Sequence, residues 1–340
     1  MSAGLTLVTG GAGFLGRHVV AALQAQGVPV RVFDVQPPPS ELASGVAVEW
    51  RQGSVTDRQA VANACAGAEQ VIHLAAIAHL WAANPADFDA VNHHGTRHVL
   101  AAARSHGCTR LVHVSSLTTR VSGRTGGAPR MQSEADIPPL SAMLGAYPRS
   151  KWQAEDAVRA AGAAGLPVRI AIPTLPLGPG DITMTPPTRM VLDYVSGATP
   201  AYLQSWLNIC DVRDMAAGIV ALADVDAPPH GVFLGGDTLS MQAFLALLQR
   251  VSGRPMPRLR VPGVAAQMVA QIDELISRRI TGRPPTAPIT GVRLARRPVI
   301  FDTSLARTLL GFAPRPLEET LHDLLAWFQS EGYWAREPAA

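Results

Sequence analysis

Two residues four positions apart, Tyr147 and Lys151, carry the clearest chemistry in this sequence. In a helix with Pro148 in its first turn, that spacing places both side chains on one face. A nearby ammonium stabilises a phenolate and lowers the pKa of a tyrosine from about 10. Such a pair can exchange a proton with a substrate hydroxyl or carbonyl. The chain has one lysine among its 29 basic residues, so position 151 is expected to need an ammonium.

A hydroxyl is expected to complete this group. The predicted strand Leu111-Val112-His113-Val114 delivers Ser115 and Ser116 to the carboxyl edge of a sheet, where open α/β folds bind ligands. Either serine could hydrogen-bond a reacting oxygen and favour negative charge on it. Spacing alone does not decide between them.

A glycine-rich loop near the start of the chain predicts a dinucleotide site. The segment Thr9-Gly10-Gly11-Ala12-Gly13-Phe14-Leu15-Gly16 follows a predicted strand and opens a predicted helix. Gly10 permits a tight turn, Gly13 lets backbone approach a pyrophosphate, and Gly16 lets the helix pack closely on the strand. The phosphates would meet the positive end of the helix, with Phe14 and Leu15 in its first turn.

Asp34 predicts the form of the cofactor. It ends the second predicted strand, 18 positions beyond Gly16, where a carboxylate can accept both adenosine ribose hydroxyls. A 2′-phosphate would be repelled there, so the sequence favours NAD over NADP. Arg31 and Arg51 keep NADP as the less favoured alternative.

The elements that must position these residues alternate between strands and helices. Apolar runs are expected as strands at 5–9, 28–34, 46–51, 70–74, 111–115 and 168–172, with helices at 15–26, 87–106 and 147–161. Buried strands separated by helices predict an α/β fold of the Rossmann type, a doubly wound parallel sheet. A smaller, mainly helical C-terminal lobe is expected to bind the substrate.

The two lobes are expected to interleave. Residues 1–172, with about 206–236, form the predicted NAD-binding lobe; about 173–205 and 237–340 form the predicted substrate lobe. The proline-rich passage 173–187 predicts a loop that faces the substrate. Helices are expected at 212–223, 240–252, 264–280 and 317–330, and a strand at 231–234.

Composition excludes several classes of protein. With 47% apolar and 16% charged residues, the chain can bury a large core and is too apolar for disorder. The net charge of +3 is small and its basic residues are dispersed, so no nucleic-acid partner is expected. Cys65, Cys108 and Cys210 are isolated and predict buried fillers. No apolar run could span a bilayer, which predicts no stable membrane insertion and a cytoplasmic protein.

No metal site is expected. The neighbouring residues His93 and His94 are the best candidates, and they would face different ways on an α-helix. Ligands from elsewhere would be needed to complete a site.

These motifs together resemble the extended short-chain dehydrogenase/reductase family, also called the NAD-dependent epimerase/dehydratase family. The resemblance covers nearly the whole chain. The matching segments are Thr9–Gly16, Val71-Ile72-His73-Leu74-Ala75-Ala76, Val91-Asn92-His93-His94-Gly95-Thr96, Val114-Ser115-Ser116, the Tyr147 and Lys151 pair, and 173–180. Within this family the chain is most similar to the dihydroflavonol-reductase and 3β-hydroxysteroid-dehydrogenase branch, and to proteins called hopanoid-associated sugar epimerases.

The resemblance implies roles for particular residues. It implies Ser116 as the catalytic serine, Tyr147 as acid/base, and Lys151 as a further contact to the nicotinamide ribose. The implied cofactor-binding set is Gly10, Gly13, Phe14, Leu15, Gly16, Asp34, Ser54, Val55, Leu74, Ala75, Ala76, Asn92, Tyr147, Lys151 and Pro173. Many relatives have aspartate where Ser54 stands. A homodimer through the helices at 87–106 and 147–161 is also implied.

Two reactions on a small-molecule substrate fit this site. An NAD-dependent dehydrogenase or reductase would act on a secondary alcohol or ketone of a ring-shaped or lipid-like compound. A nucleotide-sugar epimerase would return the hydride to the other face of a keto-sugar, and Arg293, Arg296 and Arg297 are candidates for binding its diphosphate. The expected substrate residues are Trp81, Thr118, Met184, Tyr202, Trp206 and Arg296. Leu117-Thr118 stands where dehydratases of this family carry Asp-Glu, which disfavours dehydration.

A different class, a dinucleotide-binding sensor without catalysis, is compatible with the same fold. Loss of Tyr147 or Lys151 would mark such a protein. Both residues are present, so an active enzyme is expected.

Overall fold

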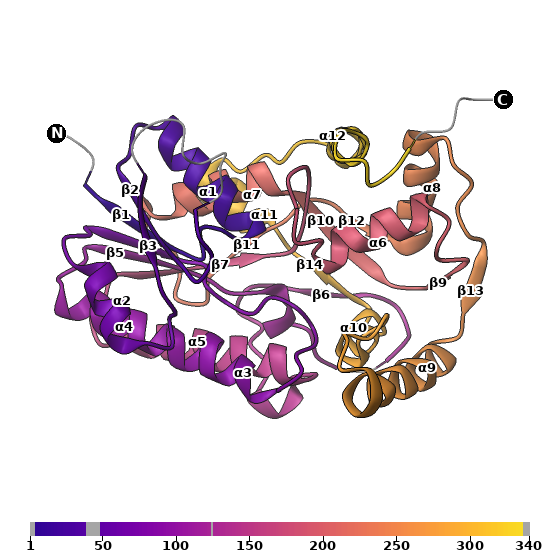
Figure 1. Cartoon of the computed structure of the whole chain (residues 1–340), viewed down its shortest axis with the longest axis horizontal. Helices are drawn as coiled ribbons and strands as arrows, with labels where there is room; N and C mark the ends of the chain where they lie inside the picture. The colour runs from indigo at the N-terminus through magenta and orange to yellow at the C-terminus, as the bar shows by residue number, and fades with distance from the viewer. Residues whose placement is uncertain (1–3, 39–47, 124, 336–340) are drawn as a thin grey trace.

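The computed structural model describes residues 4–38, 48–123 and 125–335. Its centre is a seven-stranded parallel sheet in the order β11-β7-β5-β4-β1-β2-β3 (Figure 1). The strands are β1 Thr6–Thr9, β2 Val30–Asp34, β3 Val48–Gln52, β4 Gln70–His73, β5 Arg110–Val114, β7 Val168–Pro173 and β11 Val232–Leu234. The predicted Rossmann-type sheet is therefore confirmed. The first two residues of the strand expected at 46–51 lie outside the described residues.

Helices cover both faces of this sheet. Helices α1 (Phe14–Ala25), α7 (Val212–Leu222) and α11 (Ser304–Leu310) pack on one face, while α2 (Arg58–Cys65), α4 (Gly95–Ser105) and α5 (Ala146–Ala163) pack on the other (Figure 1). Apolar side chains of both helix layers bury against the Val-rich, Ile-rich and Leu-rich strands. Burial on both faces explains why these strands read as continuous apolar runs rather than as an alternating pattern.

The second lobe is built from shorter pieces. Its helices are α6 (Pro186–Val195), α8 (Met241–Ser252), α9 (Gly263–Ile276), α10 (Ile289–Ala295) and α12 (Leu317–Ser330). A three-stranded sheet has the order β12 (Thr238–Ser240), β10 (Trp206–Asp211), β8 (Leu175–Leu177). Two small parallel pairs join β9 (Ala201–Leu203) to β13 (Leu259–Val261) and β6 (Arg130–Gln132) to β14 (Val299–Phe301). A separate apolar core lies among α6, α8, α12 and β10.

Two segments differ from what the sequence predicts. The passage 173–187, expected as loop, contains β8, which is an edge strand and therefore tolerates Pro176. The segment 304–312, expected in the substrate lobe, returns to the Rossmann lobe, where Ala306 and Phe312 join the core that contains Val8. Ala306 and Phe312 thus pack with the central sheet, not with the core formed by α8 and α12.

The helix expected at 87–106 is not uniform. A short helix α3 (Ala86–Phe88) leads into a π-helical stretch, Asp89–His94, and then into α4. Its π-helical turn alters which side chains share a face.

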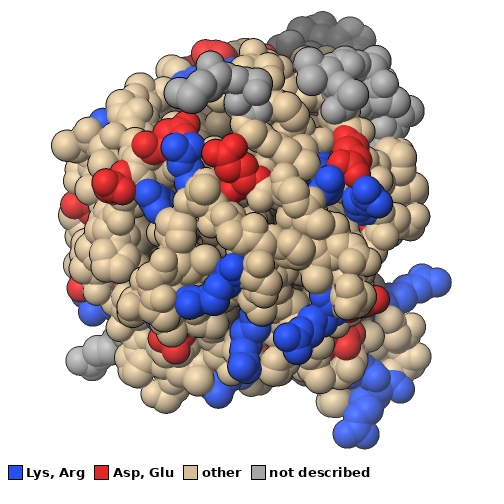
Figure 2. Space-filling view, turned by 90° about the vertical axis from the view of Figure 1, so that its left-hand side faces the viewer, with Lys and Arg blue, Asp and Glu red and all other residues tan. Residues whose placement is uncertain are grey.

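The surface and the cysteines match the composition. On the face shown in Figure 2, basic side chains are separated by acidic and neutral ones. Cys65, Cys108 and Cys210 are buried and free. Within the described part of the chain, no helix is long and apolar enough to cross a membrane.

Candidate active site

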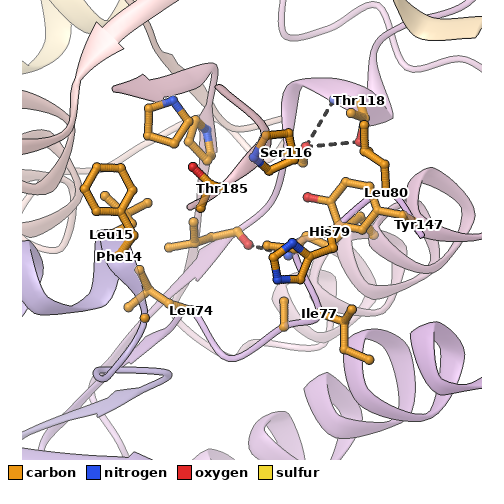
Figure 3. Close-up of a pocket in the computed structure, with 18 of the residues that line it drawn as sticks. Phe14, Leu15, Leu74, Ile77, His79, Leu80, Ser116, Thr118, Tyr147 and Thr185 are labelled. Atoms are coloured by element: carbon orange, nitrogen blue, oxygen red, sulfur yellow. Dashed lines mark hydrogen bonds between the residues drawn. The ribbon is translucent and has the colours of Figure 1, made fainter. Parts of the chain in front are cut away.

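A cavity of about 890 Å³ is lined by residues of both lobes and lies at the carboxyl ends of the parallel strands. Figure 3 shows Phe14, Leu15 and Leu74 on one side of this cavity, with Ser116, Thr118 and Tyr147 on the opposite side. The residues predicted from two distant parts of the sequence therefore meet in one place.

The glycine loop has the close packing that the motif predicts. Gly10 has a φ of +77°, and a Cβ there would lie 2.6 Å from the backbone nitrogen of Ala75. At Gly16 a Cβ would lie 2.1 Å from the Gly10 carbonyl oxygen, so α1 could not start so close to the loop. Gly13 differs, because its Cβ would meet only the Gly10 carbonyl oxygen, at 3.3 Å. Packing within the chain thus requires glycine at 10 and 16, and the open side of Gly13 lines the cavity.

The start of α1 fits a bound pyrophosphate. Its N-cap is Gly13, and no side chain caps the first turn. The N–H groups there retain their capacity to bind an anion, and the helix dipole favours negative charge at the same point. These residues fit the dinucleotide that the motif predicts.

Asp34 ends β2 at the rim of the loop. Its carboxylate accepts hydrogen bonds from the backbone N–H of Ala12 at 3.0 Å and of Gln36 at 2.9 Å. The side chain lines the cavity beside Val35, Gly53 and Ser54. Asp34 therefore both holds the glycine loop and presents its carboxylate where a ribose is expected.

Helix α5 positions the predicted tyrosine and lysine. It begins at Ala146, so Pro148 falls in the first turn and interrupts no helical hydrogen bond. Tyr147 and Lys151 are both buried and both line the cavity. The Lys151 Nζ donates to the carbonyl oxygen of Val114 at 2.6 Å, which ties α5 to the end of β5.

Hydrogen bonds distinguish the two candidate serines. The Ser115 hydroxyl donates to Glu155 Oε2 at 2.5 Å and is thus held by a buried carboxylate. The Ser116 oxygen accepts from the Thr118 hydroxyl at 3.0 Å and from the Thr118 N–H at 3.3 Å (Figure 3). The Ser116 hydroxyl lines the cavity and interacts with the Tyr147 hydroxyl, whereas Ser115 donates its proton to the buried Glu155 carboxylate.

A buried charge network lies behind this serine pair. The Arg120 Nη2 donates to Glu155 Oε1 at 2.6 Å, and both side chains are almost completely buried. Arg159 forms a second ion pair with Glu155. Removing one member of such a group leaves a charge buried without a partner. The network fixes the β5 end against α5, one helical turn beyond Lys151.

The pKa of Tyr147 differs from the expectation that the ammonium lowers it. Burial raises the pKa of the Tyr147 hydroxyl, and the hydrogen bond with Ser116 opposes that change. Burial also lowers the pKa of Lys151 to about 8, which the Glu155 charge partly counters. Both groups lose water, and desolvation favours their neutral forms.

Most of the predicted cofactor residues line the cavity. This holds for Ser54, Val55, Leu74, Ala75, Ala76 and Pro173 as well as for the glycine loop. Asn92 does not line it. Its side chain is buried and hydrogen-bonds both backbone groups of Ile77 and the Ser150 hydroxyl, so it braces the strand end that the cofactor would contact.

Only some of the predicted substrate residues line the cavity. Thr118 and Trp206 line the cavity, while Trp81, Met184, Tyr202 and Arg296 do not. Met184 and Tyr202 pack against the core of the second lobe, and Arg296 hydrogen-bonds Gln267. Aromatic and methionine residues are as suitable for a core as for a ligand, so their type could not separate the two uses.

Other cavity residues were not expected as site residues. They are mainly apolar and include Ile77, His79, Val121, Leu207, Leu294 and Phe301. Leu294 and Arg297 belong to the segment 291–297, so the expected basic cluster does reach the cavity, through Arg297 rather than Arg296. Val121 and Phe301 carry no local signal, because the topology alone brings them to the site.

Arg297 has an unusual environment. Burial lowers the pKa of its guanidinium, as do the charges of Arg296 and Arg293. Its Nε is buried and, among the described residues, has no hydrogen-bond partner. Its positive charge is thus an electrostatic cost that an anion in the cavity would relieve.

The two adjacent histidines contradict the expectation that they face different ways. The rings of His93 and His94 stack with centroids 4.7 Å apart, and both contact the Asp89 carboxylate, at 3.0 and 3.2 Å. Both residues lie in the π-helical stretch Asp89–His94, which begins at the aspartate that they contact. These three side chains could hold a metal ion, and their mutual contacts account for the cluster without one.

Comparisons with known proteins agree with this geometry. The model of the NAD dependent epimerase/dehydratase family matches residues 6–235. The chain is 32% identical to a Synechocystis sp. protein provisionally named dihydroflavonol 4-reductase, covering 96% of this chain and 95% of that protein. It is 29% identical to sterol demethylase protein B of Methylococcus capsulatus, covering 96% and 99%.

A solved structure shares the fold. The nucleoside-diphosphate-sugar epimerase from Pseudomonas aeruginosa has a TM-score of 0.78 at 21% identity, covering 97% of this chain and 99% of that one. The family model alone covers more than half of the chain. This chain is therefore an NAD-dependent enzyme of the extended short-chain dehydrogenase/reductase type, a member of the NAD dependent epimerase/dehydratase family.

Proposed function

We propose that this enzyme transfers a hydride between nicotinamide and a secondary alcohol or ketone on an apolar, ring-shaped or lipid-like compound. The observation that carries the proposal is the apolar character of the cavity wall. Side chains from both lobes make that wall, and most of them are apolar: Ile77, Leu80, Val121, Met190, Trp206, Leu207, Leu294 and Phe301. Such a wall gains free energy by enclosing an apolar ring, and a few polar groups would orient it.

The proposed chemistry uses three residues of the chain. Bound NAD would supply the hydride acceptor, and its reduced form the hydride donor. The Tyr147 oxygen takes the hydroxyl proton during oxidation and gives a proton to the carbonyl oxygen during reduction. The Ser116 hydroxyl donates a hydrogen bond to the same substrate oxygen. The ammonium of Lys151 favours the phenolate form of Tyr147.

Tyr147 can act in both directions of this reaction. Its neutral phenol, the form that burial favours, gives a proton to a carbonyl oxygen during reduction, and its phenolate accepts the hydroxyl proton during oxidation. The names of two relatives, a dihydroflavonol 4-reductase and a sterol demethylase protein, refer to ring-shaped compounds.

Epimerisation of a nucleotide sugar is the second candidate, and Arg297 is the observation that favours it. Its guanidinium lines the cavity and forms no ion pair with any residue that the structure describes, so it suits a phosphate oxygen. Arg296 is engaged by Gln267, and neither it nor Arg293 lines the cavity. A diphosphate would thus meet one of the three arginines, which makes this the weaker proposal.

The cofactor, assembly and location are further proposals. The position of Asp34 supports NAD rather than NADP, because its carboxylate lines the cavity where a 2′-phosphate would be repelled. The family resemblance supports a homodimer formed through α4 and α5, and the sequence supports a cytoplasmic location.

A substrate screen tests the proposal. The purified enzyme would be incubated with NAD and hydroxysteroids, terpenoid alcohols, flavanonols or nucleotide sugars, and with NADH and the matching ketones. NADH absorbance and product stereochemistry would be read together. Net change in NADH with an apolar compound supports the proposal, whereas inversion of a nucleotide sugar without net NADH supports the epimerase.

The variant Arg297→Gln separates the two reactions. An epimerase that binds a diphosphate through Arg297 should lose affinity, seen as a KM raised about tenfold or more. A dehydrogenase acting on an uncharged alcohol should keep its KM. Arg307→Gln, on the exposed surface of α11, is the matched control.

A further inference from the structure

The large apolar side chains of helix α9 face the solvent and not the protein core. Twelve large apolar residues of the described chain are exposed, and seven of them lie between positions 264 and 280. They are Val264, Met268, Val269, Ile272, Leu275, Ile276 and Ile280. At 3.6 residues per turn, these positions share an arc of about 160°, so they form one continuous stripe. We call this stripe the α9 apolar face.

The opposite side of α9 makes the contact with the protein, and it is built from small residues. Ala270 is fully buried and packs with Ala266 against Ile289 and Val292 of α10. The acidic residues also lie towards α10, since Asp273 accepts from the Ala287 N–H and Glu274 from the Ile289 N–H. Alanines inside and large apolar residues outside reverse the usual arrangement of an amphipathic helix.

Basic residues flank both ends of the α9 apolar face. Arg258 and Arg260 precede the helix, and Arg279 and Arg283 follow it. All four are exposed, and within the described part of the chain none has an acidic partner within ion-pair distance. The two acidic residues of α9 are turned to the protein side, so the outward side is apolar in the middle and positive at its ends.

We propose that the α9 apolar face docks on the surface of an anionic lipid bilayer. The apolar face of such a helix inserts between the lipid headgroups and the acyl chains of a bilayer. Arginines beside it bind the lipid phosphates. No described helix could cross a membrane, so α9 lies along the surface and does not span it. In Figure 1, α9 forms the lower edge of the second lobe, with α10 on its inner side.

A second copy of this chain fits the same face less well. A symmetric dimer through α9 would bring together two faces that are basic at both ends, whichever way the helices run. Arginines would then oppose arginines without intervening acidic residues, which is unfavourable. An anionic surface neutralises all of them at once.

Docking would also place the cavity close to the lipid. Helix α10, which α9 covers, supplies Gly291, Leu294 and Ala295 to the cavity wall. An apolar substrate held in a bilayer would thus reach the enzyme on the side that builds the substrate end of the site. This consequence depends on the proposed function, whereas the docking itself does not.

Flotation of the full chain with vesicles tests the docking. Vesicles of phosphatidylcholine alone and of phosphatidylcholine with phosphatidylglycerol would be compared, and binding should be stronger with phosphatidylglycerol and weaker at high salt. The substitution Ile272→Glu, at a side chain that is 58% exposed, should lower vesicle binding about tenfold or more. Met131→Glu, at an exposed methionine outside α9, is the control and should bind as the wild type does.

A charge variant tests the second part of the inference. Arg279→Glu should weaken binding to phosphatidylglycerol vesicles roughly fivefold or more and leave binding to pure phosphatidylcholine little changed. Arg110→Glu, on the far lobe, should have no effect. Thermal melting of each variant confirms that it is folded.

Two results would overturn the proposal. One is a wild-type protein that stays unbound with both kinds of vesicle, or an Ile272→Glu variant that floats with them as well as the wild type does. The other is self-association: sedimentation without lipid would show a dimer that Ile272→Glu dissociates, and vesicle binding would be absent. Neither readout uses catalysis, so failure here is distinct from failure of the proposed reaction.

Discussion

Desolvation controls the ionisation of the two proposed catalytic residues. Tyr147 and Lys151 are both buried, and burial shifts each pKa towards the neutral form. The pKa of Lys151 falls to about 8, so this residue changes charge within the working range of an enzyme. The carboxylate of Glu155, one turn further along α5, keeps that pKa from falling more.

The lowered pKa of Lys151 predicts an upper pH limit for ketone reduction. Lys151 is an ammonium below about pH 8 and loses its charge as the pH rises through that value. The ammonium stabilises the phenolate that Tyr147 becomes after it gives its proton, so turnover should decline above about pH 8. The measurement is kcat against pH with saturating NADH and ketone. A rate that stays constant well above pH 8 contradicts the role assigned to Lys151.

The carboxylate of Asp34 should set the choice of cofactor. Asp34→Asn keeps the size of the side chain and an oxygen that can accept from Ala12, while it removes the charge that repels a 2′-phosphate. We expect the ratio of kcat/KM for NAD to that for NADP to fall about tenfold or more. Asp224→Asn, at an exposed residue, is the control. An unchanged ratio would show that Asp34 does not face the ribose.

At the scale of elements, the junction of β1, the glycine loop and α1 separates two uses of glycine. Gly16 lies so close to the Gly10 carbonyl that a Cβ would clash, whereas a Cβ at Gly13 would make one close contact, 3.3 Å from the same carbonyl oxygen. Gly16 is required by packing within the chain, and we propose that Gly13 serves the close approach of the cofactor. This distinction follows from the described contacts and is not visible in the motif.

Two alanine variants test that distinction. Gly16→Ala should destabilise the protein by about 1–3 kcal/mol, because the start of α1 must move away from the loop. Gly13→Ala should leave the melting temperature without cofactor nearly unchanged and weaken NAD binding, since the methyl group would occupy the space expected for a pyrophosphate. Calorimetric melting with and without NAD measures both effects. Equal behaviour of the two variants would contradict the assignment.

The elements also show what the sequence could predict. The long apolar strands and the glycine loop are local patterns, so β1, α1, β2 and β7 were predicted within a few residues. The strand β8 was missed because Pro176 argues against a strand unless its place at a sheet edge is known. The stacked rings of His93 and His94 lie in a π-helical stretch, which no residue type signals.

The same distinction between local patterns and long-range contacts applies to the site. Tyr147, Lys151 and Asp34 belong to spaced motifs, and the structure brings them to one cavity. Spacing could not choose between Ser115 and Ser116, because the choice depends on Glu155, which lies 40 positions from Ser115. The substrate end is made by the meeting of two lobes, so Phe301 and Val121 could be found only in three dimensions.

On the scale of the whole molecule, the two lobes share one chain that passes between them repeatedly. The segment 304–312 returns to the Rossmann core after the second lobe has been built. The sheet centre holds two fully buried histidines, His73 on β4 and His113 on β5. The His73 ring hydrogen-bonds Thr9 at 2.7 Å and Thr96 at 2.9 Å.

These histidines predict that the whole fold is sensitive to acid. Burial lowers the pKa of His73 from its ordinary value of 6.5 to about 3. Between these values the unfolded chain binds more protons than the folded one, so the free energy of unfolding rises with pH and is lost as the pH falls from about 6.5 towards 3. Denaturant unfolding at several pH values measures the slope. His73→Gln should make it shallower, while His106→Gln, at an exposed residue, should leave it unchanged.

The most direct test of the account compares the wild type with Tyr147→Phe. Both proteins would be titrated with NADH, followed by fluorescence, and then assayed for ketone reduction on the apolar substrate that the screen identifies. We predict that the variant binds NADH as the wild type does and reduces the ketone about a hundredfold or more slowly. A variant that binds NADH equally well and turns over at the wild-type rate would contradict proton transfer by Tyr147.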